Sequence, residues 1–61
     1  MPVVTVQMYE GRSDDQKRRL AKAITDALVE IAVTKPEACE IIIQDIPRKN
    51  WMIAGKMGDE A

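Results

Sequence analysis

The sequence predicts an α+β fold in which a β-α-β unit with parallel strands is followed by a short C-terminal hairpin. Two stretches rich in apolar and β-branched residues, Val3–Tyr9 and Cys39–Ile46, have the pattern of strands that are covered on both faces. The amphipathic stretch between them has the length of a crossover helix, and a right-handed parallel connection is the default for such a unit. A chain of 61 residues holds one domain at most.

The helix is predicted to begin after Ser13 and to run to about Val33. Ser13 and Gln16 have the spacing of a capping box, and the two aspartates between them suit the first turn of a helix. Pro36 ends the helix because proline disfavours helical geometry in the residue before it. One apolar stripe is expected to face the sheet, and it consists of Leu20, Ile24, Ala27, Leu28 and Ile31. The basic run Lys17–Arg19 is expected on the solvated side, where it can pair with the aspartates of the first turn.

The segment after Ile46 is expected to form the small hairpin. It contains a turn-like Pro-Arg-Lys-Asn stretch, the short apolar segment Trp51–Gly55 and two of the three glycines. A sheet of two strands with one helix leaves one face and both edges open, although both strands require two covered faces. The sequence therefore predicts an oligomer, either a symmetric dimer that joins two sheets or a larger closed ring.

Composition excludes several classes of function. A formal charge of −1 supplies no overall field for nucleic acid, so none is expected as a partner. No apolar run approaches the roughly 18 residues of a membrane span and no signal segment is present, so we expect no membrane association and a reducing cytoplasm. One cysteine and no histidine exclude an internal disulfide and the usual zinc sites, and no cofactor is expected.

The same counts limit the catalytic groups. Ser-His-Asp and Cys-His arrangements are impossible, so acid and base chemistry falls to carboxylates, Lys, Tyr or the chain terminus. Cys39 is expected to be an inert packing group. Pro2 has two interpretations: proline is tolerated at the first residue of a strand, or removal of Met1 turns it into a terminal secondary amine. Arg12, in the loop between strand and helix, either binds a ligand or is solvated. Trp51 either packs in the core or between subunits, or forms the wall of a site.

These features together resemble the 4-oxalocrotonate tautomerase family. The resemblance is carried by the Met-Pro start, by Glu-Gly-Arg-Ser-Asp-Asp-Gln-Lys at 10–17 and by the stretch 40–56, and it covers nearly the whole chain. It implies a single tautomerase domain over residues 1–61, a β-α-β fold with a C-terminal hairpin, and a homohexamer built as a trimer of dimers.

The resemblance also implies the chemistry. Pro2, once exposed, is the general base that moves a proton on an unsaturated 2-oxo or enol acid. Apolar surroundings, for which Val3, Trp51 and Ile53 are candidates, lower the pKa of its amine by disfavouring the cation. Arg12 matches the arginine that holds the distal carboxylate of a small-molecule substrate, and Trp51 stands where the family usually has a phenylalanine that walls the site.

One position departs from the family. Its best-studied members have a second arginine in the second strand, and the matching residue here is Glu40, which repels an anionic substrate. Arg48 is a candidate to bring its guanidinium into this gap. Two alternatives stay open: a hydratase or dehalogenase in which cationic Pro2 is the acid and Glu40 activates water, and a non-catalytic oligomeric binding protein in which Pro2 only begins a strand.

Overall fold

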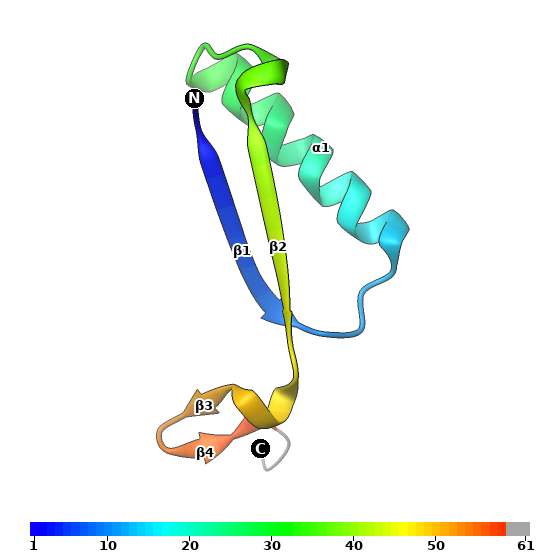
Figure 1. Ribbon diagram of the computed structural model, residues 1–61, viewed down its shortest axis with the longest axis vertical. Helices are drawn as coiled ribbons and strands as arrows, with labels where there is room; N and C mark the ends of the chain where they lie inside the picture. The colour runs from blue at the N-terminus through cyan, green and yellow to red at the C-terminus, as the bar shows by residue number, and fades with distance from the viewer. Residues whose placement is uncertain (59–61) are drawn as a thin grey trace.

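The computed structural model describes residues 1–58 and shows the predicted α+β architecture (Figure 1). Its elements are β1 (Val3–Tyr9), α1 (Asp14–Ile31), η1 (Pro36–Ala38), β2 (Glu40–Ile46), η2 (Arg48–Asn50), β3 (Met52–Ile53) and β4 (Lys56–Met57). β1 and β2 pair in parallel, and β3 and β4 form an antiparallel hairpin. The β-α-β unit with parallel strands and the C-terminal hairpin are therefore confirmed.

The boundaries of α1 follow from local hydrogen bonds. The capping box is present, since the Gln16 N–H donates to Ser13 Oγ at 3.1 Å and the Ser13 N–H donates to Gln16 Oε1 at 2.9 Å. The helix ends at Ile31, two residues before the expected end, because Val33 adopts a left-handed conformation with φ of 55°. β2 begins one residue later than expected, because the Cys39 N–H closes the η1 turn on the Pro36 carbonyl.

The helix face that packs on the sheet differs in part from the expected stripe. Leu20, Ile24 and Leu28 are half-buried as predicted, whereas Ala27 is exposed and Ile31 is 80% exposed. Two strands only about 5 Å apart are too narrow to cover the whole stripe. No helix among the described residues is long and apolar enough to cross a membrane.

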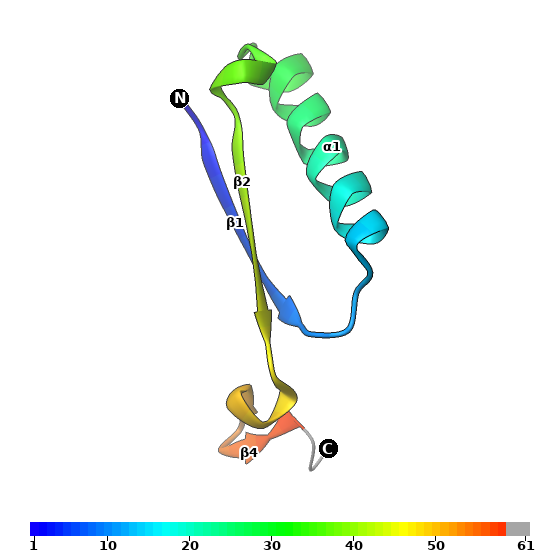
Figure 2. The same cartoon turned by 45° about the vertical axis from the view of Figure 1, so that its right-hand side comes forward.

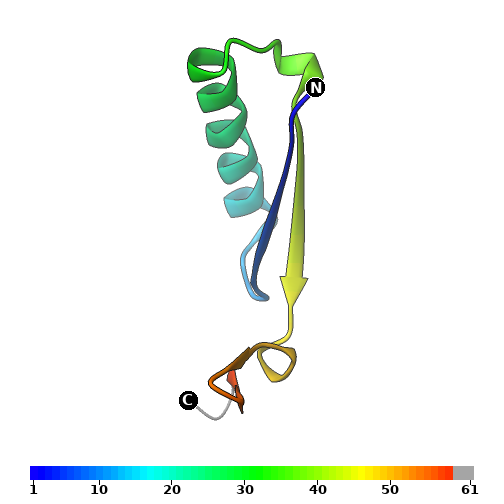
Figure 3. The same cartoon turned by 90° about the vertical axis from the view of Figure 1, so that its left-hand side faces the viewer.

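The sheet has one covered face and one open face. The side chains toward α1 are half-buried, and they are Val4, Val6, Met8, Ile41 and Ile43. On the opposite face Val3 stands beside Glu40 and Thr5 beside Ile42, while Gln7 Nε2 donates to Gln44 Oε1 at 2.9 Å. Figure 3 shows α1 on one side of the strands and no described element over the other side.

A single copy has no closed core. None of the described residues is fully buried, and large apolar side chains such as Val3 (53%), Ile42 (48%) and Ile53 (63%) remain exposed. The radius of gyration is 14.4 Å, against about 10.5 Å for a compact domain of this length. The chain therefore lacks the burial that an independent fold requires.

An ion pair ties the start of α1 to the end of β2. Lys17 Nζ lies 2.5 Å from Asp45 Oδ2, with the two side chains 27% and 38% exposed. The expected solvation of Lys17 is thus wrong, since the side chain turns toward the sheet, whereas Arg18 and Arg19 pair with Asp15 as predicted. The hydrogen bond that Lys17 donates to Asp45, opposed by partial burial, raises the pKa of Lys17 above its usual 10.5.

We expect the folded protein to be an oligomer, because the open face and both sheet edges need partners. Light scattering at micromolar concentration is expected to give a mass several times the 6.8 kDa of one chain. Ile42→Glu places a charge at the centre of the open face and is expected to reduce both the mass and the thermal midpoint, with Ala23→Glu at an exposed position of α1 as the control. A folded, stable wild-type monomer contradicts the expectation.

The raised pKa of Lys17 predicts a stability that depends on pH. A group whose pKa is higher in the folded state contributes stability fully below its unfolded pKa and loses it as pH rises through the folded value. Lys17→Met is therefore expected to lower the thermal midpoint at about pH 8, and its difference from wild type is expected to shrink above about pH 10.5. Lys22→Met, which removes an exposed pair with Asp26, is the control and is expected to have a smaller effect. A pH-independent difference overturns the interpretation.

Candidate active site

Pro2 lies at the open start of β1, beside the first residue of β2. Its carbonyl accepts a hydrogen bond from the Glu40 N–H at 3.0 Å, and the next residue, Val3, is in register with Glu40. Pro2 is half-buried, while Met1 is 86% exposed. While Met1 is attached the Pro2 nitrogen is an amide without basicity, so this end becomes chemically active only as a free terminus.

Arg12 lies beyond the opposite end of β1, in the loop that leads to α1. Gly11 allows this loop to turn, because its φ of 118° is strained for any side chain. The Arg12 guanidinium is exposed, and its Nη1 donates to the Tyr9 carbonyl oxygen at 3.3 Å. The rest of its fork of donors is available to a ligand.

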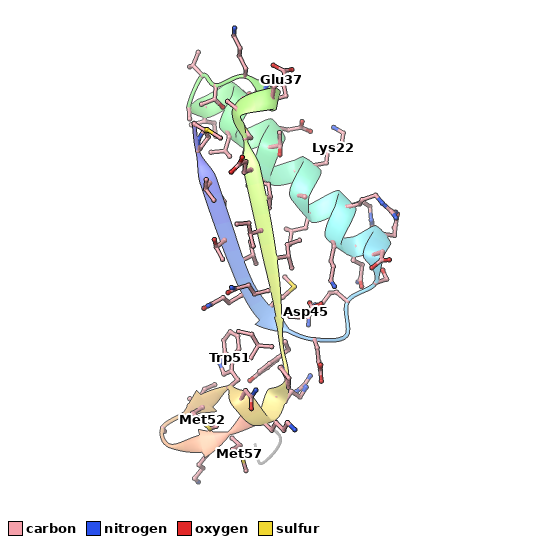
Figure 4. All side chains as sticks on the ribbon, in the orientation of Figure 1. Lys22, Glu37, Asp45, Trp51, Met52 and Met57 are labelled. Atoms are coloured by element: carbon pink, nitrogen blue, oxygen red, sulfur yellow. The ribbon has the colours of Figure 1, made fainter. Side chains whose placement is uncertain are left out.

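Tyr9, the last residue of β1, joins the strand to the C-terminal segment. The Trp51 ring packs edge-on against it, with centroids 4.9 Å apart and planes at 62°, and the Arg48 guanidinium carbon lies 4.6 Å above the Tyr9 ring centroid. These contacts have the geometries of an aromatic pair and a cation–π interaction. Figure 4 shows Trp51 between the end of the sheet and the hairpin that carries Met52 and Met57.

Two surface hollows lie around this cluster. One, of about 220 Å³, is lined by Gln7, Ile46, Asn50, Trp51 and Met52. The other, of about 360 Å³, is lined by Glu10, Pro47, Arg48 and Lys49. Aromatic and cationic groups therefore border concave surface at this end of the strands.

The structure separates the sequence-predicted site residues into two groups. Pro2 and Glu40 lie at the starts of β1 and β2, whereas Arg12, Arg48 and Trp51 follow the ends of these strands. Figures 1 and 2 both show the two strands running side by side, with their starts at one end of the sheet and their ends at the other. Seven residues of strand span roughly 23 Å, farther than a small acid can bridge. One chain therefore does not hold a complete site.

Within one chain, this separation keeps two sets of predicted site residues apart. Arg48 cannot fill the gap beside Glu40 of its own chain, because the two stand at opposite ends of β2. Of the apolar residues expected around Pro2, only Val3 is close to it in sequence and space, while Trp51 and Ile53 belong to the hairpin end.

Sequence reasoning missed Tyr9, although it is the only tyrosine and directly precedes the Glu-Gly-Arg loop. Cys39 was expected to pack inertly, and it is half-buried with Sγ 3.3 Å from Thr34 Oγ1 and 3.4 Å from the Lys35 carbonyl oxygen, to which it donates. These contacts hold the connection between α1 and β2.

The chain is a small α+β protein with a proline at one end of its two-stranded sheet. A cluster of arginine and aromatic side chains lies at the other end of that sheet. The family model for tautomerase enzymes matches residues 2–60. The chain is 44% identical over 61 residues to the 2-hydroxymuconate tautomerase of Comamonas testosteroni, covering 98% of this chain and 95% of that protein. It is 39% identical over 56 residues to the 2-hydroxymuconate tautomerase of Bacillus subtilis, covering 92% and 90%.

A solved structure extends the likeness to three dimensions. A heterohexamer 4-oxalocrotonate tautomerase from Chloroflexus aurantiacus matches with a TM-score of 0.92 and 32% identity over 98% of this chain and 97% of that one. The chain is thus a tautomerase, an isomerase by reaction class. It belongs to the tautomerase family, and its relatives include the 4-oxalocrotonate tautomerases.

Proposed function

We propose that this tautomerase moves a proton between carbon positions of an unsaturated 2-oxo or enol acid, with Pro2 as general base after removal of Met1. The observation that carries the proposal is the position of Pro2 at the start of β1, next to the exposed Met1. The secondary amine formed there accepts a proton from one carbon of the substrate and returns it to another. A base at neutral pH must be partly unprotonated, and apolar surroundings favour that state.

A second copy supplies the groups that one chain keeps too far from Pro2. The sheet order β1-β2 leaves one edge of β1 unpaired, and two such edges related by a two-fold axis run antiparallel. That pairing brings Pro2 of one chain beside Arg12 of the partner subunit. The homohexamer built as a trimer of dimers, which the family resemblance implies, and a cytoplasmic location, expected from the composition, are further parts of the proposal.

Within such a site each group has a physical role. The Arg12 guanidinium holds a substrate carboxylate, for which its planar fork of donors is suited. Trp51, half-buried against Tyr9, forms an apolar wall that excludes water from the reacting carbons.

Glu40 supports one alternative reaction. The backbone N–H of Glu40 donates to the Pro2 carbonyl oxygen, so this residue is the neighbour of Pro2 that carries a carboxylate. In a hydratase or dehalogenase of unsaturated acids, a carboxylate beside a cationic proline activates water. In that reaction Pro2 is the acid. The same protein variants distinguish this alternative from the tautomerase and from a binding protein without catalysis.

Activity is expected to require the free Pro2 amine. Protein that retains Met1, verified by intact mass, is expected to lose about 10²- to 10⁴-fold in kcat/KM, the usual contribution of a general base. In processed protein the rate is expected to rise with pH as the amine loses its proton, and Glu40→Gln is expected to leave tautomerisation as fast or faster. A rate that falls over the same pH range, and that is lost in Glu40→Gln, supports the hydratase instead. Full activity with Met1 retained overturns both enzymatic mechanisms.

Arg12 is expected to contribute to the binding of a carboxylate substrate. Arg12→Ala is expected to lower kcat/KM by about 10- to 150-fold, since a charged hydrogen bond contributes about 1.5–3 kcal/mol, with a rise in KM. Arg18→Ala is the matched control, because Arg18 lies on the exposed helix face beside Asp15. Equal kinetics for the two variants identify Arg12 as a solvated loop residue.

A further inference from the structure

The four arginines of the chain differ in their partners. Arg18 and Arg19 pair with Asp15 at 4.0 and 3.1 Å. Among the described residues, no carboxylate pairs with Arg12 or Arg48, and both of these arginines instead contact Tyr9. The two guanidinium groups that pair with no carboxylate of residues 1–58 are therefore both held by one residue, at one end of the strands.

Tyr9 holds the two guanidinium groups in different ways. Its carbonyl oxygen accepts a hydrogen bond from Arg12 Nη1, and its ring supports the Arg48 guanidinium from below. A guanidinium held over the face of a ring does not use its N–H groups in that contact as hydrogen-bond donors to a carboxylate, so they can donate to one from a ligand. Lys49 adds a third positive charge in the Arg48 hollow, and Glu10 is the carboxylate that opposes them there.

The Pro2 end has the opposite charge. Glu40 stands beside Val3 on the open face, next to the Pro2 carbonyl. A carboxylate there repels a substrate that carries its own carboxylate next to the reacting carbons. A substrate that extends from Pro2 of one chain to Arg12 and Arg48 of the partner subunit thus passes from a negative to a positive environment.

We infer that the preferred substrate is an enolisable acid whose carboxylate is remote from the reacting carbons, and that Arg48 acts with Arg12 as the second group that binds this carboxylate. Tyr9 is the positioning residue for both arginines. This inference rests on the proposed function, since it assumes that Pro2 is the base. In the reaction the Pro2 amine accepts the proton of the enol hydroxyl and returns a proton to the carbon between the two oxygen-bearing carbons, so no other reactant is consumed.

Three β-diketones that share one reacting centre test the inference. Acetylacetone carries no charge, acetylpyruvate has a carboxylate attached to the diketone, and 4,6-dioxoheptanoate has two methylene groups between them. Ketonisation is followed by the loss of enol absorbance with processed enzyme. We expect kcat/KM to be highest for 4,6-dioxoheptanoate and lowest for acetylpyruvate, and Glu40→Gln to raise the value for acetylpyruvate. No preference for 4,6-dioxoheptanoate over acetylpyruvate overturns the inference, while Pro2-dependent turnover of acetylacetone preserves the proposed function.

Variants of the arginine cluster test the roles of Arg48 and Tyr9. Arg48→Met is expected to lower kcat/KM for 4,6-dioxoheptanoate by about 10-fold or more and to have a much smaller effect on acetylacetone, with partial recovery in Arg48→Lys. Tyr9→Leu removes the ring that supports both Arg48 and Trp51, so it is expected to lower kcat/KM for both diketones and more strongly for 4,6-dioxoheptanoate. Tyr9→Phe retains the ring, and its effect is expected to be small. Arg18→Met is the control for the loss of one positive charge. Equal losses on the charged and the neutral diketone contradict carboxylate binding by Arg48.

If none of the diketones is turned over, a binding measurement distinguishes the proposed function from the inference about the remote carboxylate. That result contradicts the proposed function for this class of compound, but the fluorescence of Trp51, the single tryptophan, still reports binding at this site. Tighter binding of 4,6-dioxoheptanoate than of acetylpyruvate, lost in Arg48→Met, supports the inference about the carboxylate. Equal affinities overturn it.

Discussion

The rest of the structure depends on a sheet of only two strands with one helix on one face. Such a unit cannot bury both faces of strands as apolar as β1 and β2, and none of the described residues is fully buried in a single copy. The apolar area that stabilises a fold must then come from contact between copies. The same constraint accounts for the distance between Pro2 and Arg12 in the proposed site. A site formed between two copies can combine the start of β1 from one copy with the end of β1 from the other.

The β1 strand acts as a spacer between two chemical environments. Its start carries Pro2 beside Glu40, and its end carries the cationic and aromatic groups gathered on Tyr9. Tyr9 also fixes the C-terminal segment to the sheet through Trp51. Gly58 completes this junction, because a Cβ there would lie 2.7 Å from the Arg48 carbonyl oxygen and 3.2 Å from the Tyr9 hydroxyl. The position of the hairpin and the position of the arginines are therefore coupled.

Local sequence signals predicted most of the fold, because their causes act over a few residues. The capping box at Ser13 and Gln16 determined where α1 begins, and the β-branched composition of 3–9 identified β1 with its observed ends. The errors were also local: the left-handed Val33 ended the helix early, and the η1 turn delayed β2 by one residue. The candidate residues Pro2, Arg12 and Trp51 were found through residue types and motif spacing, which need no coordinates.

Other features were decided only by tertiary structure, because a periodic pattern shows that a side chain faces inward or outward but not which distant residue it meets. Lys17 meets Asp45 across 28 positions of sequence, and it therefore faces the sheet rather than solvent. Tyr9 meets Arg48 and Trp51 only because β2 returns the chain to the end of β1. The sequence by itself determined the elements, their order and the chemical groups available, whereas the parallel register determined that Pro2 with Glu40 and Arg12 with Arg48 stand at opposite ends of one sheet.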